Sequence, residues 1–237
     1  MRMAARALLL AGLASLGCAA SAVAQAPTEA SIHPSLVPDR LGASAALTLA
    51  LRYSGGEEGV PEPLRTIVVR LPAGLGIDLR GVSSCPAARL RRQGAAGCPS
   101  GSLLGRGRAA LEVHAGSQML PEQAAAWAFR GPNRGSSPTL EILSQGYTPL
   151  DERTLSTGVL RGEDDAPYGS QLTISIPPIP TLVYEPDASV RTLSLTISRS
   201  GTIVVPDSCH AGGFAFAAAS TFADGSTTTA AASVPCP

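Results

Sequence analysis

Apolar and polar residues alternate with a period of two along much of this chain, and that alternation constrains its fold more than any other feature. In residues 46–53, ALTLALRY, the leucines and Tyr53 fall on one face, and Thr48 and Arg52 fall on the other. The same pattern recurs in residues 66–71, 109–115, 139–144, 171–176, 191–198 and 202–205. It is typical of antiparallel strands with one packed face. We therefore predict an all-β fold, an antiparallel β-sandwich of roughly nine to eleven strands, immunoglobulin-like in general architecture.

The sequence also predicts one or two short helices. Residues 83–94, SSCPAARLRRQG, place Pro86 early and Gly94 at the end, as a short helix requires. Residues 121–129, PEQAAAWAF, favour one or two further helical turns.

A C-terminal hairpin is predicted around Asp224-Gly225, because such a pair suits a two-residue type I′ turn. This turn places Phe222 opposite Thr227. Phe214, Phe216 and Phe222 then share one face at period two, and we expect that face to be buried.

The first 24 residues have the features of a secretory signal peptide. Two arginines precede an uncharged apolar run that ends on Ala22-Val23-Ala24, a small-x-small pattern suited to signal peptidase. We predict a signal peptide over 1–24 and a single secreted β-sandwich domain over 25–237. The expected location is the exterior or the cell surface. Two alternatives stay open: an uncleaved anchor, or a lipidated Cys18 in SLGC, where the leucine is one place too close to the cysteine.

Four cysteines remain after cleavage: Cys85, Cys98, Cys209 and Cys236. An even number in an exported chain indicates disulfides rather than metal or redox chemistry. Three connectivities are possible, of which the local one, Cys85–Cys98 with Cys209–Cys236, is the simplest. Loops of these lengths would contribute about 3 and 3.5 kcal/mol of stability.

The charge balance argues against nucleic acid or an anionic membrane as a partner. The chain has 18 basic and 18 acidic residues, so its formal net charge is zero. No strong field attracts nucleic acid, and we expect no nucleic-acid partner. A membrane contact is expected only if the N-terminal segment is retained or Cys18 is lipidated.

Two stretches of the chain carry a family resemblance. One runs CPAARLRRQGAAGCPSGSLLGRGRA from Cys85, and the other is the tail from Cys209 that ends DGSTTTAAASVPCP. Together they resemble an uncharacterised set of exported proteins from GC-rich actinobacteria, with His210 standing where proline is expected. The resemblance implies export and a disulfide-bearing β fold, and it implies no activity.

No complete catalytic or metal motif is found. The chain lacks a G-x-S-x-G sequence, and its three histidines are scattered: His33 near a flexible mature N-terminus, His114 at an outward strand position and His210 beside a cysteine. We expect no enzyme activity and no cofactor. The acidic run Glu163, Asp164 and Asp165 is a weak calcium candidate, and a solvated turn is the simpler interpretation.

Two groups of residues are candidates for binding. The aromatic group is Trp127, Tyr147 and Tyr168, and the basic group is Arg89, Arg91 and Arg92. Exposed aromatic rings stack on sugars, and arginines bind phosphates through paired hydrogen bonds. Trp127 can equally anchor the core.

From these features we expect a secreted or envelope-associated, non-catalytic protein that has a binding or structural role. Its expected partner is a cell-wall polymer or another envelope protein. The alternative is a hydrolase of envelope polysaccharide that uses loop carboxylates, with Glu141, Asp151, Glu152 and Glu163 as candidates.

Overall fold

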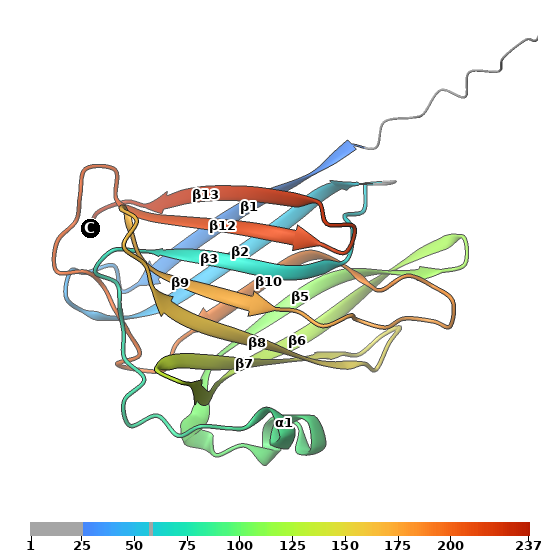
Figure 1. The fold of residues 1–237 in the computed structure, drawn as a ribbon, viewed down its shortest axis with the longest axis horizontal. Coiled ribbons are helices and arrows are strands. Elements are labelled where there is room, and N and C mark those ends of the chain that lie inside the picture. The colour runs from blue at the N-terminus through green and yellow to red at the C-terminus, as the bar shows by residue number, and fades with distance from the viewer. Residues whose placement is uncertain (1–25, 57–58) are drawn as a thin grey trace, which may run out of the picture.

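The computed structural model describes residues 26–56 and 59–237, and these form an all-β, sandwich-like fold as predicted (Figure 1). The predicted signal peptide and Cys18 lie outside the described residues. No helix of the described ranges is long and apolar enough to cross a membrane.

One sheet contains all thirteen strands of the described residues. The strands are β1 (Ala26–Val37), β2 (Ser44–Gly56), β3 (Leu64–Pro72), β4 (Gly76–Ile77), β5 (Leu103–Ala115), β6 (Gln118–Arg134), β7 (Ser137–Gly146), β8 (Arg153–Gly162), β9 (Tyr168–Ser175), β10 (Ser189–Ile197), β11 (Ile203–Val204), β12 (Phe214–Phe222) and β13 (Thr227–Val234).

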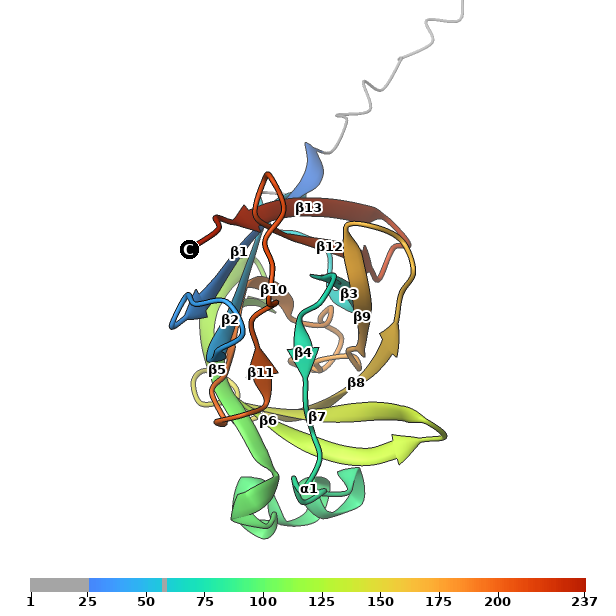
Figure 2. The same cartoon turned by 90° about the vertical axis from the view of Figure 1, so that its left-hand side faces the viewer.

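The two layers of the sandwich are parts of this continuous sheet. Strands β1, β2, β10, β5 and β6 form one layer, and β7, β8, β9, β3, β12 and β13 form the other, with β6 pairing to β7 at the turn between them. At the opposite side β1 lies against β13, so that the strands surround a common interior (Figures 1 and 2).

Side chains that meet inside this interior hold its two layers together. The predicted inward faces line this interior. Leu47, Leu51 and Tyr53 of β2 are buried and Leu49 is half-buried. On β3 the buried residues include Ile67, Val69 and Leu71. The Tyr53 hydroxyl lies 2.8 Å from the Ser220 hydroxyl of β12, and its ring meets Phe222 edge to face. Burial raises the pKa of Tyr53 to about 12, an effect that the Ser220 hydrogen bond partly offsets.

The predicted helix at residues 83–94 is present as α1 (Ala87–Gln93). Its Leu90 is buried in a second, smaller core on the outer face of β6 to β8, together with Phe129 and Leu143. The predicted disulfide Cys85–Cys98 closes this segment.

The C-terminal disulfide Cys209–Cys236 is also as predicted, with 5.9 Å between its Cα atoms. It joins the residues that precede β12 to those that follow β13 and so closes the open end of the hairpin. The three phenylalanines of the predicted inward face are buried.

The register of this hairpin differs by one residue from the prediction. Thr221, rather than Phe222, pairs with Thr227. A type I′ turn needs positive φ at both central residues, and here Gly225 has φ of 83° while Asp224 does not have positive φ. Asp224 instead accepts hydrogen bonds from the backbone N–H and the hydroxyl of Ser226, which lengthens the turn.

Two further predictions were wrong. Residues 121–129, predicted as helical turns, lie within β6, which pairs with β5 on one side and β7 on the other. The helix preference of its alanines is therefore outweighed by two hydrogen-bonded ladders. Likewise His33 does not lie in a flexible terminus: it belongs to β1, where Ile32 and Leu36 are buried.

We predict that Gly107→Ala destabilises the protein, because a Cβ at Gly107 would lie 2.1 Å from the backbone oxygen of Ser194 on β10. Overpacking of this kind lowers the free energy of unfolding by about 2 to 3 kcal/mol. Urea unfolding measures this loss. Gly162→Ala is the matched control, since a Cβ there meets nothing within 4 Å. Equal stability of the two variants would contradict the close approach of β5 and β10.

Candidate functional site

The middle of the outer face of β1, β2, β10, β5 and β6 combines arginines with small and hydroxyl-bearing residues, and we call this part the outer platform. Strand register arranges it in three rows. The rows are Ser31, Arg52, Thr192, Ala110 and Gln123; His33, Ala50, Ser194, Arg108 and Ala125; and Ser35, Thr48, Thr196, Arg106 and Trp127. Every position is small, hydroxylated, basic, amide-bearing or aromatic, and none is acidic.

Three arginines give the outer platform its charge. Arg52, Arg106 and Arg108 are exposed, and none of them forms an ion pair within residues 26–56 and 59–237. The next acidic residue along β5, Glu112, lies beyond the platform and pairs with Arg191 at 3.7 Å. Within the described ranges, the platform therefore presents three arginines without an ion-pair partner, and Glu29 of β1 lies one row beyond it.

The platform is hollowed along its middle. A shallow groove of about 490 Å³ is bordered by long side chains, including His33, Arg52, Arg108 and Gln123, while small residues such as Ala50 and Ser194 line it between them. Hydroxyl groups meet across strands in the adjoining row, where Thr48 and Thr196 are 2.8 Å apart. Such a groove offers hydrogen-bonding groups and charge to an extended polar ligand.

Trp127 connects the outer platform to the second core. It is half-buried and packs against the cluster around Leu90 and Phe129, so it anchors this cluster, as the sequence allowed. Its cross-strand partner on β5 is Arg106. The accessible part of the indole thus lies at the edge of the platform.

The other predicted binding residues lie apart from the outer platform. Arg89, Arg91 and Arg92 are exposed on α1. Tyr147 is 59% exposed in the loop between β7 and β8. Tyr168, at the start of β9, lies under the guanidinium of Arg70, 4.4 Å from its ring centre. The structure does not bring the predicted aromatic residues together.

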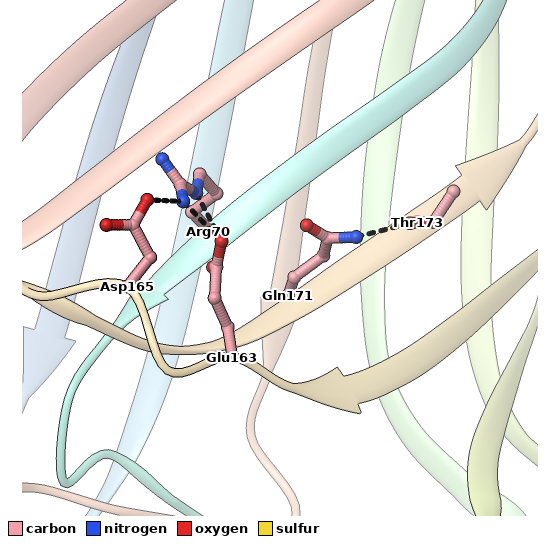
Figure 3. Close-up of polar contacts among 5 residues, drawn as sticks. All are labelled: Arg70, Glu163, Asp165, Gln171 and Thr173. Carbon is pink, nitrogen blue, oxygen red and sulfur yellow. Dashed lines mark hydrogen bonds and ion pairs between the residues drawn. The ribbon is translucent and has the colours of Figure 1, made fainter.

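The acidic run after β8 binds an arginine of the chain itself (Figure 3). Arg70 of β3 donates hydrogen bonds to Glu163 and to Asp165, the latter at 2.5 Å. The Glu163 and then the Asp165 carboxylates raise the pKa of Arg70. Asp164 is exposed, and the described residues contain no group of three metal-ligating side chains suited to a metal ion. The run therefore clamps the β8–β9 turn to β3.

The carboxylates proposed for a hydrolase are spread along β8. Asp151 and Glu152 precede this strand, Glu141 hydrogen-bonds Thr157 in its middle at 2.9 Å, and Glu163 follows it. About 35 Å of extended chain therefore separates Glu152 from Glu163. A glycosidase needs two carboxyl groups within about 10 Å, so these two do not form such a pair.

The histidines also lie on separate elements. His33 is on the outer platform, His114 is near the end of β5, and His210 adjoins the Cys209–Cys236 disulfide.

A buried carboxylate that the sequence did not single out is Glu122 of β6. Its two oxygens accept hydrogen bonds from the backbone N–H groups of Tyr147, Thr148 and Leu150 at 2.8 to 3.1 Å. It thereby fixes the β7–β8 loop. No local motif marks this role, because the donors are more than 20 residues away in the chain.

The comparisons with known proteins found no matching family model, no matching curated protein and no matching solved structure.

We predict that Glu141→Gln becomes relatively more stable than the wild type as the pH rises. Burial raises the pKa of Glu141, and the hydrogen bond from Thr157 and the charges of Arg134 and Arg91 only partly oppose this. The unfolded chain then ionises first, so wild-type stability falls between the ordinary pKa and the raised one. Urea unfolding at several pH values measures this difference.

Thr157→Val serves as the companion variant in that experiment. It removes the hydroxyl donor to the Glu141 carboxylate, so the pKa should rise further and the stability should fall more steeply with pH. A wild-type pH profile that coincides with that of Glu141→Gln would contradict this assignment.

Proposed function

We propose that this protein is an exported, non-catalytic binding protein of the cell envelope, and that its outer platform binds an anionic polysaccharide. The observation that carries the proposal is the set of three exposed, unpaired arginines in the described structure, placed among hydroxyl groups in three rows without acidic residues. The resemblance to exported actinobacterial proteins and the signal-like N-terminus support the envelope location. The two disulfides indicate an oxidising compartment.

The chemistry of the outer platform suits a charged sugar polymer. Arginine binds carboxylate or phosphate groups through paired hydrogen bonds, and serine and threonine hydroxyls both donate to and accept from sugar hydroxyls. At the edge, the accessible part of Trp127 offers an apolar surface to a sugar ring.

The spacing of the charges favours a polysaccharide over a nucleic acid. Strand geometry places the Cα atoms of Arg106 and Arg108 about 7 Å apart and that of Arg52 about 12 Å from Arg108. Double-stranded DNA carries one charge per about 1.7 Å of its axis, and the zero net charge of the chain provides no long-range attraction to it. Widely spaced arginine side chains among hydroxyl groups suit a polymer that carries one anionic group per sugar unit.

The test is binding of the oxidised protein to polygalacturonate, a carboxylated glycan, measured by titration calorimetry, with neutral dextran as the reference polymer. The triple variant Arg52→Gln, Arg106→Gln, Arg108→Gln should bind polygalacturonate at least tenfold more weakly than the wild type. Raising the salt concentration should weaken wild-type binding more steeply than variant binding, since fewer ionic contacts remain to be screened.

Two control variants each lose three positive charges, as the platform variant does, but at positions outside the outer platform. Replacing Arg40, Arg161 and Arg199 with glutamine should change the affinity less than twofold. Replacing Arg89, Arg91 and Arg92 of α1 with glutamine should also leave most of the affinity. The proposal fails if the wild type does not bind, if it binds dextran equally, or if either matched variant loses as much affinity as the platform variant.

A further inference from the structure

The interior of the sheet contains a cavity, which we call the inner cavity. Its volume is about 140 Å³, and inward-facing side chains of β2, β3 and β5 to β10 line it. It lies between the two layers, on the opposite face of the strands that form the outer platform. Figure 2 shows how these strands surround the interior of the fold.

The inner cavity exists because small residues occupy inward positions where larger ones would fill the space. Ala109 of β5 and Ala124 of β6 are cross-strand partners, and Gly146 of β7 continues the same row. Ala126 follows two residues along β6. These four small residues line the cavity. The larger Leu193 of β10, which is the cross-strand partner of Ala109, also borders it.

The inward leucines around the cavity are not fully covered. Leu49, Leu193 and Leu195 face inward from the middle of their strands, yet each is only half-buried, whereas Leu51 beside them is buried. Apolar surface in a closed core is normally in contact with other side chains. The uncovered surface therefore marks a place where an apolar group can pack.

One corner of the inner cavity is polar. Ser156 of β8 is only 8% exposed and borders the cavity. Ser144 and Thr154, which are opposite each other on β7 and β8, add two half-buried hydroxyl groups. A hydroxyl group can both donate and accept a hydrogen bond, so this corner of the cavity can bond with a polar group of a ligand.

The charges that border the cavity disfavour an anion. Glu122 lines it with a carboxylate that already accepts three backbone N–H groups, and the carboxylate-bearing Glu152 lies at the β7–β8 end. Arg108 borders the cavity through its strand but is exposed on the outer platform.

We propose that the inner cavity binds a short aliphatic molecule that carries one neutral hydrogen-bonding group. The chain packs against the uncovered leucines, and the polar group bonds with the Ser156 hydroxyl. An apolar cavity of about 150 Å³ accepts benzene, so the volume of the inner cavity suits a chain of about six carbons. This binding site is independent of the outer platform and of its polysaccharide.

The ligand reaches the cavity from the end that bears the β7–β8 and β9–β10 loops. Leu150 and Ile179, which line the cavity at this end, are half-buried. The β9–β10 loop also carries an exposed apolar tip there, at Leu182, Val183 and Tyr184, of which Tyr184 is fully exposed. An aliphatic molecule thus meets apolar surface before it enters.

The test is a titration of the oxidised, methyl-labelled protein with 1-hexanol, followed by NMR. We expect saturable one-to-one binding that shifts the inward methyl groups of Ala124 and Ala126 more than the outward methyl group of Ala125. Hexanoate at pH 7 should bind at least tenfold more weakly. Ser156→Ala should weaken hexanol binding about three- to tenfold, the contribution of one hydrogen bond.

Ala126→Leu fills the cavity and should lower the hexanol affinity at least tenfold, while Ala125→Leu on the other face of β6 is the matched control. If Ala126→Leu does not fold, the wild-type shift pattern and the Ser156→Ala titration decide. The proposal is overturned by non-saturating shifts, by shifts that are equal on both faces of β6, by hexanoate binding as tightly as hexanol, or by equal affinity of folded Ala126→Leu and Ala125→Leu.

Discussion

The close contact between β5 and β10 determines the arrangement on which both faces of this protein depend. Strand β10 follows β5 by more than 70 residues, yet it lies between β2 and β5 and pairs with both. Gly105 and Gly107 allow this, since a Cβ at either position would lie about 2 Å from a backbone oxygen of β10. Both glycines lie shortly after Cys98, so a physical role can be given to this part of the sequence.

Each strand of this layer contributes side chains to both the polar outer platform and the apolar inner cavity, because its side chains alternate between the two faces. Along β10, Thr192 and Ser194 belong to the outer platform, while Leu193 and Leu195 border the inner cavity. Along β6, the outward Trp127 and the inward Ala126 are neighbours in the sequence. A polar ligand outside and an apolar ligand inside can therefore be bound by opposite faces of the same strands.

The alternation of apolar residues was enough to predict an all-β fold, the inward faces and the buried phenylalanines, because these depend on local periodicity. Local cysteine spacing and the hairpin suggested the correct disulfides. The alanine-rich part of β6 was mistaken for helix, since its strand conformation is imposed by β5 and β7. The outer platform could not be predicted either: Arg52 and Arg108 become neighbours only through β10, which lies far from both in the sequence. The inner cavity likewise depends on which small residues meet across strands.

The most direct test of this account is the solvent exposure of the alanine methyl groups of β6, measured by NMR with a soluble gadolinium relaxation agent. The account predicts strong relaxation for Ala125 and weak relaxation for Ala124, Ala126 and Ala128, which is the period-two pattern of a strand with one face inside. A period of three to four residues, or equal relaxation of Ala124, Ala125 and Ala126, would show that β6 does not separate an interior from an outer platform.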